Sequence, residues 1–150
     1  MIVFRPLTTP DFQMLFEWLQ RPHVKEWWDD GDDTLDKVIS HYSPDSKSRK
    51  FIAEISGEAK GYFQYYKIDR NHFGADQFLA NERDLSRGMG TACLTVFVQK
   101  IIDIENVENI SVDPHPDNLR AIRCYEKCGF LHDVAKSKPG IHCMTKYLEG

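Results

Sequence analysis

The segment that most constrains how this chain folds is a short loop with two glycines, Leu85-Ser86-Arg87-Gly88-Met89-Gly90-Thr91. Apolar residues at helical spacing follow it, and a strand-like segment, 75–79, precedes it. A strand, a glycine loop and a helix can bind phosphate, because the first N–H groups of a helix lack partners and carry its positive dipole end. Alternatively, Gly88 and Gly90 only permit close packing of the strand against the helix.

The same loop excludes two common nucleotide sites. No Gly-Lys-Ser or Gly-Lys-Thr follows it, so it is not the phosphate loop of an ATPase. The third glycine of the dinucleotide-binding fingerprint is also missing. We therefore expect a phosphate-bearing ligand other than ATP or a typical dinucleotide.

The composition and net charge of the sequence limit the kinds of molecule that the protein can bind. The 150 residues carry a net charge of −4, with 41% hydrophobic and 28% charged residues, which predicts one globular domain over 1–150. A mildly acidic chain disfavours nucleic acid and suits a small cationic substrate. Residues 1–20 lack the pattern of a secretion signal, and no apolar run reaches the length of a membrane span. We expect a cytoplasmic protein, a monomer or homodimer, that does not bind membranes.

The four cysteines are expected to be reduced thiols. Cys124 and Cys128 lie four residues apart, with His132 and His142 downstream. Their spacing matches no common zinc motif, and the segment is more typical of a protein core. No metal is therefore expected.

An aromatic and acidic segment, Trp27-Trp28-Asp29-Asp30, is a candidate for binding an amine. A polyamine or an amino sugar would stack on the indole rings and donate charge-assisted hydrogen bonds to the carboxylates. Alternatively, the tryptophans are buried and the aspartates form a solvated loop.

Three further residues suggest chemistry. Asp76 lies in a mostly apolar strand, where a carboxylate needs a polar cavity or hydrogen-bonding partners. Asn118 and Tyr125 share one face of a helix expected over 118–127, about 10 Å apart along its axis. One of these side chains can hold an extended ligand while the other acts at its end, unless the tyrosine is simply packed.

The expected helix caps are Thr9, Thr34 and Asp117.

The expected order of elements is a strand, two helices, three antiparallel strands, the glycine loop with its helix, a strand, a helix and two strands. A tight turn, Ser56-Gly57-Glu58, is expected between the first two of the three antiparallel strands. This order, the Arg87–Thr91 loop and the segment Tyr125-Glu126-Lys127-Cys128-Gly129-Phe130 resemble the GNAT superfamily of acetyl-CoA-dependent N-acetyltransferases. Segments 74–81 and 113–127 are similar to motifs of its aminoglycoside 6′-N-acetyltransferases. The resemblance covers nearly the whole chain. It implies an α+β fold with a mostly antiparallel twisted sheet, splayed at the acetyl-CoA site and flanked by helices.

The resemblance also implies roles for individual residues. Asp76 would be the base that takes a proton from the amine, and Tyr125 the acid that protonates the leaving thiolate. Backbone N–H groups near Gln77 and Phe78 would stabilise the oxyanion. The residues implied to bind acetyl-CoA are Gln77, Phe78, Leu79, Ser86, Arg87, Gly88, Met89, Gly90, Thr91, Asn118 and Ala121. Those implied to bind the acceptor are Trp28, Asp29, Asp30, Gln64, Asp76 and Asp113.

Two departures from the family pattern leave the acceptor open. Leu85 stands where the wider family often has Gln or Arg, and the segment Tyr65–Phe73 is shorter than in the aminoglycoside enzymes. The primary expectation is transfer to the 6′-amino group of aminoglycosides. Alternatives are a siderophore hydroxylamine, a polyamine or a protein amine as acceptor, and a sensor that binds acetyl-CoA without turnover.

Overall fold

The chain forms two compact units, and the computed structural model describes residues 1–148. The first unit contains Met1–Gln64 and Gln77–Arg83; the second contains Tyr65–Asp76 and the residues from Asp84 onward. Strands β3 and β4 therefore contribute residues to both units. Glu149 and Gly150, the end of the domain expected over 1–150, lie outside the described residues.

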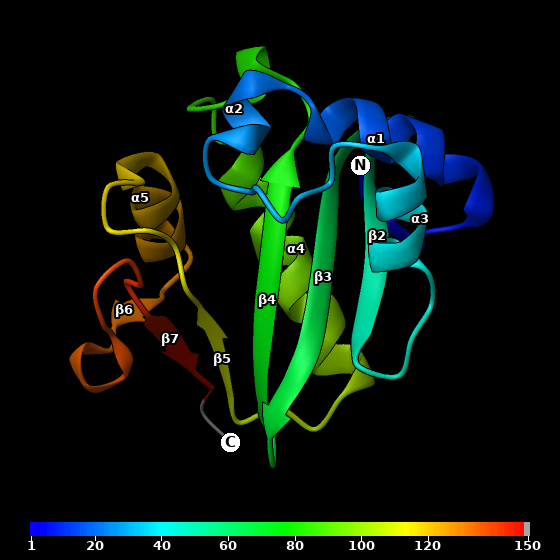
Figure 1. The fold of residues 1–150 in the computed structure, drawn as a ribbon. Helices are drawn as coiled ribbons and strands as arrows, with labels where there is room; N and C mark the ends of the chain where they lie inside the picture. The colour runs from blue at the N-terminus through cyan, green and yellow to red at the C-terminus, as the bar shows by residue number, and fades with distance from the viewer. Residues whose placement is uncertain (149–150) are drawn as a thin grey trace. The chain divides into compact units, whose positions relative to one another are not determined.

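The first unit consists mainly of the N-terminal elements (Figure 1). These are β1 (Ile2–Pro6), a 3-10 helix (Thr9–Asp11), α1 (Phe12–Leu19), α2 (Pro22–Lys25), α3 (Leu35–Tyr42), β2 (Ser48–Ile55) and the first part of β3 (Glu58–Asp69). β1 pairs with β2 in antiparallel fashion, from Ile2 opposite Ile55 to Pro6 opposite Phe51. The predicted tight turn between β2 and β3 is present, with Ser56 and Gly57 both at positive φ.

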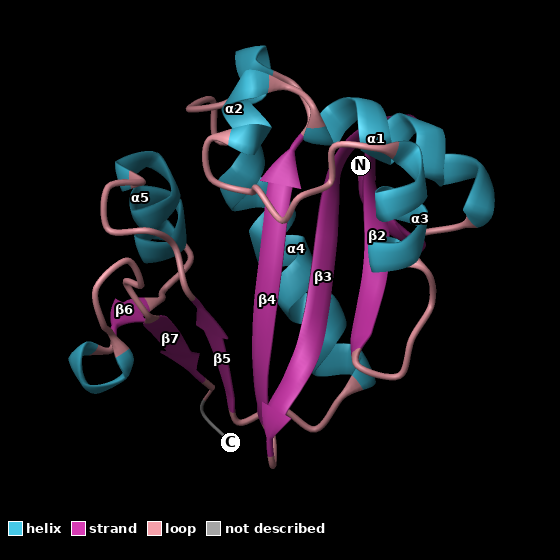
Figure 2. Ribbon diagram, viewed as in Figure 1, coloured by secondary structure: helices cyan, strands magenta, loops and turns pink. Residues whose placement is uncertain are grey.

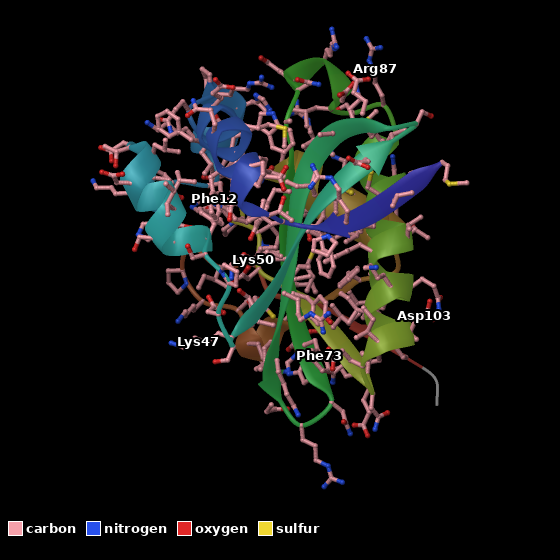
Figure 3. All side chains as sticks on the ribbon, turned by 90° about the vertical axis from the view of Figure 1, so that its right-hand side faces the viewer. Phe12, Lys47, Lys50, Phe73, Arg87 and Asp103 are labelled. Carbon is pink, nitrogen blue, oxygen red and sulfur yellow. The ribbon has the colours of Figure 1, made fainter. Side chains whose placement is uncertain are left out.

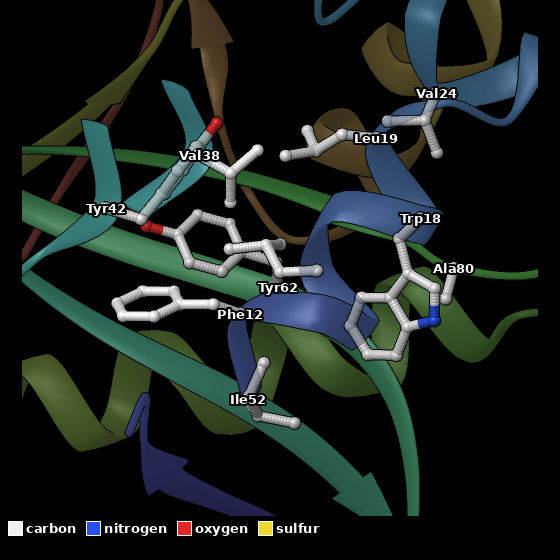
Figure 4. Close-up of a cluster of buried hydrophobic side chains, with 10 residues drawn as sticks. Phe12, Trp18, Leu19, Val24, Val38, Tyr42, Ile52, Tyr62 and Ala80 are labelled. Carbon is white, nitrogen blue, oxygen red and sulfur yellow. The ribbon is translucent and has the colours of Figure 1, made fainter. Parts of the chain in front are cut away.

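An aromatic cluster forms the core of the first unit (Figure 4). Helix α1 turns Phe12, Leu15 and Leu19 toward it, at the spacing of one helical face. Val38 and Tyr42 of α3 and Tyr62 of β3 complete it, and the rings of Tyr42 and Tyr62 meet edge-on with centroids 5.3 Å apart. The cluster thereby fixes α1 and α3 against the strand that carries Gln64.

The second unit contains the C-terminal elements, shown by type in Figure 2. They are the second part of β3, most of β4 (His72–Leu79), α4 (Met89–Ile104), β5 (Asn109–Val112), α5 (Leu119–Lys127), β6 (Leu131–His132), a 3-10 helix (Val134–Lys136) and β7 (Met144–Tyr147). A further 3-10 helix, Glu82–Asp84, precedes the glycine loop. Tyr65 packs against Phe73 and Phe97, and its hydroxyl donates a 2.8 Å hydrogen bond to Glu105 Oε2, so α4 is held along the β3–β4 hairpin.

The seven strands run in the order β1-β2-β3-β4-β5-β7-β6. β4 and β5 pair in parallel, whereas β7 pairs antiparallel with both β5 and β6. The expected α+β fold with a mostly antiparallel sheet is confirmed. The segment 65–73, expected to be a shortened loop, is the end of a hairpin in which only Arg70 and Asn71 separate the strands.

Two of the predicted helix caps are wrong by one residue. Thr8, not Thr9, precedes the first helical turn, because its N–H and hydroxyl both donate to Asp11 Oδ2, at 2.8 and 3.0 Å. Asn118, not Asp117, caps α5, because its side-chain oxygen accepts the N–H of Ala121. Thr34 caps α3 as predicted.

Candidate functional site

A cavity of about 410 Å³ in the first unit brings together three of the predicted acceptor residues, Trp28, Asp30 and Gln64. They come from the loop after α2 and from β3. The other residues that line it are His41, Tyr42, Asp45, Lys47, Ser48 and Lys50. The cavity thus combines an indole face with carboxylate and amide oxygens, which suits an amine that carries hydroxyl groups.

Charge in this cavity is mixed. Burial, and the neighbouring charge of Asp32, raise the pKa of Asp30 above its usual range. Lys50 donates to Asp45 Oδ2 at 3.0 Å, and hydrogen bonds from Ser48, Lys50 and Lys47 lower the pKa of Asp45 to about 2. Figure 3 shows Lys47 and Lys50 on the segment that enters β2. Asp29, also predicted to bind the acceptor, is outside the cavity lining and accepts the N–H of Gly31 in an exposed turn.

In the second unit, the strand register brings Asp76 and Asp113 together. The parallel pairing of β4 and β5 ends at Gly74 opposite Ser111, and each aspartate lies two residues further along the chain, Asp76 within β4 and Asp113 just after β5. The Asp76 side chain is near enough to the Asp113 carboxyl to lower its pKa through hydrogen bonding. Burial raises the pKa of Asp113 above its usual range. This carboxyl pair is the feature best suited to proton transfer in the second unit.

Tyr66 belongs to the same group of residues, although the sequence analysis missed it. Burial and the charges of Asp76 and Asp113 raise the pKa of its phenol. Its ring lies across Gly74, where an added Cβ would be 2.4 Å from Tyr66 Cζ. Gly74 therefore gives the phenol room to lie beside the carboxyl pair. The signal in the sequence was Gly74, two residues before Asp76, which the sequence analysis treats only as part of a family motif.

The glycine loop has the geometry of an anion site. Gly88 caps α4 in the left-handed conformation, with φ of 82°, and an added Cβ there would meet nothing within 4 Å. Ser86 is also left-handed, and its hydroxyl accepts a 2.9 Å hydrogen bond from Arg120 Nε of α5. Arg87 extends away from the ribbon (Figure 3). Open space, the first N–H groups of a 16-residue helix and the guanidinium of Arg120 together fit a pyrophosphate. Arg120 is a second residue that the sequence analysis missed.

The three predicted residues at the end of β4, Gln77, Phe78 and Leu79, belong to the first unit. The Phe78 ring packs edge-on against Trp18 and Trp28. The carbonyl of Leu79 is hydrogen-bonded to His23 Nε2 at 3.0 Å. The Phe78 side chain thus packs against the core of the first unit.

Helix α5 carries the remaining predicted residues. Asn118 uses its side-chain oxygen as the helix cap, so its amide N–H groups are the part available to a ligand. Ala121 follows on the first turn, and the Tyr125 ring meets Phe130 edge-on at 5.7 Å. The Sγ atoms of Cys124 and Cys128 each lie 3.6 Å from an oxygen of Thr91, which ties α5 to the first turn of α4.

The four cysteines are free thiols. Within residues 1–148, no group of three or more His, Cys, Asp or Glu side chains is placed to hold a metal ion. No helix in that range is long and apolar enough to cross a membrane.

Comparison with known proteins gives one consistent answer. Residues 8–135 match the family described as acetyltransferase (GNAT) domain. The chain is 37% identical over 156 residues to aminoglycoside N(6′)-acetyltransferase type 1 of Klebsiella pneumoniae, covering 92% of this chain and 78% of that protein. It is similar to the structure of AAC(6′)-Ib in complex with paromomycin and acetyl-CoA, with a TM-score of 0.89 and 35% identity over 97% of this chain and 93% of that one. The complex of AAC(6′)-Ib with coenzyme A and kanamycin gives a TM-score of 0.89 at 34% identity, covering 98% and 95% of the two chains.

Proposed function

The chain belongs to the GNAT acetyltransferase family, and on that premise we propose that it transfers the acetyl group of acetyl-CoA to the 6′-amino group of aminoglycosides. The observation that carries this proposal is the cavity that unites Trp28, Asp30 and Gln64. An amino sugar presents apolar ring faces together with ammonium and hydroxyl groups, and these match an indole, a carboxylate and an amide. We also propose that the two units act as one catalytic domain over 1–150, in the cytoplasm, as a monomer or homodimer.

Acetyl-CoA, when bound, supplies the acetyl thioester that the amine attacks. We assign its pyrophosphate to the backbone N–H groups from Ser86 to Thr91, with Arg120 adding a positive charge beside Ser86. The amide N–H groups of Asn118, near Ala121, are assigned to its extended arm. The supporting observation is the open, left-handed cap at Gly88, which admits a group close to the backbone.

Asp76 is proposed as the group that takes the proton from the amine. An alkylammonium has a pKa near 10, so at neutral pH it must lose a proton before it can attack. The carboxylate of Asp76, beside Asp113, would attract the ammonium and offer an oxygen that can accept its proton. Tyr125 would hold the proton that the leaving sulfur requires at its phenol oxygen.

A second acceptor class is favoured by one observation. Lys47 and Lys50 line the same cavity as Asp30 and Asp45, and their two ammonium groups offset the negative charge that would attract a ligand with many positive charges. An amine with a single positive charge would meet less repulsion. A metabolic amine is therefore the second candidate.

The test is release of the CoA thiol from acetyl-CoA with kanamycin, tobramycin and amikacin, beside spermidine and lysine. We expect release with the aminoglycosides. Asp76→Asn is expected to lower kcat by about 10²- to 10⁴-fold, the usual contribution of a general base. Asp69→Asn, on the exposed end of the same hairpin, is the matched control and should keep kcat.

Three outcomes are distinguishable. Release with spermidine or lysine but not with the drugs would keep the acetyltransferase and replace the acceptor. Release that is equal in the native protein and Asp76→Asn would remove Asp76 as the base. Binding of acetyl-CoA without release toward any of these amines would overturn the proposed acceptors.

A further inference from the structure

A buried carboxylate in the loop before α3 is unexplained by the function proposed so far. The Asp32 side chain is 4% exposed, although it lies in a segment rich in charged residues. A carboxylate in such a place is costly unless several donors surround it. Asp32 was not among the predicted site residues, and it is outside the cavity lining.

Two side chains of α3 hold this carboxylate. The Tyr42 hydroxyl donates to Asp32 Oδ2 at 2.9 Å, and His41 Nδ1 hydrogen-bonds to Asp32 Oδ1. The backbone carbonyl of Asp32 accepts a 2.6 Å hydrogen bond from Gln20 Nε2. The loop is therefore tied at one residue to both α3 and the end of α1.

The hydrogen bonds continue from Asp32 to the cavity. Since the Tyr42 hydroxyl gives its proton to Asp32, its oxygen is free to accept, and Trp28 Nε1 donates to it at 2.9 Å. Burial raises the pKa of Tyr42 well above its usual range, so the hydroxyl stays protonated and keeps this direction. The two hydrogen bonds therefore form a chain in which every donor points the same way, from Trp28 through Tyr42 to Asp32.

The bond to Tyr42 is the directional contact of Trp28, whose ring otherwise packs against aromatic side chains. The ring meets Tyr62 and Phe78 edge-on, with centroids 5.9 and 5.1 Å apart. Edge-on contacts between aromatic rings are favourable, but they involve no hydrogen bond. The indole N–H is the one directional group of the side chain, and its bond to Tyr42 selects which part of the ring faces the cavity.

Asp33, the next residue, is an aspartate outside this chain of hydrogen bonds. Asp33 has a side chain that is 59% exposed and forms a surface ion pair with Lys37 Nζ at 2.8 Å. Such pairs contribute little to stability. Asp33 is therefore a matched control for Asp32, because it is the neighbouring aspartate and lies outside the chain of hydrogen bonds.

We propose that Asp32 is a positioning residue that acts through Tyr42 to orient Trp28 as a wall of the acceptor cavity, and so sets the affinity for the acceptor. This inference rests on the proposed function only in assigning the cavity to the acceptor. Because Asp32 does not line the cavity and acts on it through the side chains that do, it affects acceptor binding and not the transfer step.

The first measurement is kinetic. Asp32→Asn and Tyr42→Phe are expected to raise the KM for the acceptor about tenfold and to change kcat and the KM for acetyl-CoA less than about twofold. Asp33→Asn should change none of these. In the double variant Asp32→Asn with Trp28→Phe, the KM should rise no further than in Trp28→Phe alone, because both changes break one chain.

The second measurement needs no acceptor. In protein labelled with ¹⁵N at tryptophan, Trp28→Phe identifies the indole N–H resonance of Trp28. That resonance should move in Asp32→Asn and in Tyr42→Phe, and stay in place in Asp33→Asn. The resonances of Trp18 and Trp27 serve as internal references that the variants are folded.

The outcomes separate this inference from the proposed function. If the native protein acetylates no aminoglycoside, the kinetic series is run with the amine that it does acetylate, and the resonance of Trp28 still reports the positioning. An unchanged acceptor KM in folded Asp32→Asn and Tyr42→Phe, or an unmoved Trp28 resonance in either variant, would overturn the inference. Loss of stability alone, with both readouts unchanged, would reduce Asp32 to a loop anchor.

Discussion

The cavity of the first unit and the glycine loop of the second are built in opposite ways. The cavity depends on side chains from separate segments, such as Trp28, Tyr42 and Gln64, held by hydrogen bonds between residues far apart in sequence. The loop depends on the backbone of one continuous segment, with a left-handed glycine at its centre. Recognition by side chains is altered by changing those side chains, whereas recognition by backbone is altered by changing its conformation. The acceptor site should therefore be the more easily modified of the two.

The largest effect is expected from a change of backbone preference in the loop. Gly88→Val places a β-branched residue at φ of 82°, which costs at least about 1–2 kcal/mol. If this cost falls on binding, the KM for acetyl-CoA rises about tenfold or more. Gly57→Val is the matched control, because Gly57 has φ of 83° and also has nothing within 4 Å of an added Cβ. Steady-state kinetics should show a raised KM in the first variant only, and a raised KM for the acceptor would contradict the comparison.

A change of side chain in the cavity should have the converse effect. Trp28→Phe removes the N–H that donates to Tyr42 and part of the stacking surface. The KM for the acceptor is expected to rise about five- to tenfold, about 1 kcal/mol, with the KM for acetyl-CoA unchanged. Trp27→Phe, at a half-exposed neighbour outside the cavity lining, is the control. Equal effects of the two substitutions would argue against the cavity as the acceptor site.

The carboxyl pair predicts a pH dependence of acceptor binding. The pKa of Asp113 is raised by burial; above that pKa the group is charged and attracts an ammonium, and as the pH falls through it the charge is lost. The KM for the acceptor should therefore rise about threefold or more as the pH is lowered from about 7.5 to about 4, the ordinary pKa of a carboxyl group. Asp113→Asn should flatten this profile, whereas Asp117→Asn, on the exposed side of the same loop, should leave it unchanged. A profile that persists in Asp113→Asn would assign the dependence to another group.

The smallest effect should come from a side chain within the loop itself. Arg87 is exposed and extends away from the ribbon (Figure 3), so Arg87→Ala should change the affinity for acetyl-CoA less than about twofold. Titration calorimetry with acetyl-CoA provides the measurement. A loss of about tenfold would mean that the loop also binds through side chains, and the contrast between the two regions would fail.

The same contrast explains which features were predictable from the sequence. The glycine loop, the α4 helix and the β2–β3 turn were predicted because each is specified by neighbouring residues, such as Gly88 before an apolar helix. Asp76 and Asp113 were identified through motifs, but their contact depends on the parallel register of β4 and β5, which no local pattern specifies. Trp28 was predicted to bind the acceptor, while the residues that orient it were missed because Tyr42 lies 14 residues away.

Tyr66 and Arg120 were missed for a related reason. Tyr66 acquires its place only because β4 has no side chain at Gly74, and Arg120 only because α5 lies beside the glycine loop at Ser86. The two misplaced caps have a simpler cause. Thr8 and Thr9, like Asp117 and Asn118, are adjacent residues of which both types cap helices. The choice depends on the contact that each makes: Thr8 donates to Asp11, and the Asn118 side chain accepts the N–H of Ala121.

The close approach at Gly74 also limits how this chain can diverge. Any side chain at position 74 would overlap the ring of Tyr66, with atoms 2.4–2.6 Å from the new Cβ. A descendant can therefore acquire a larger residue at 74 only if position 66 first accepts a smaller one or its ring turns away. The two positions should change as a pair in that order, and a library that varies both together would find sequences that single substitutions cannot reach.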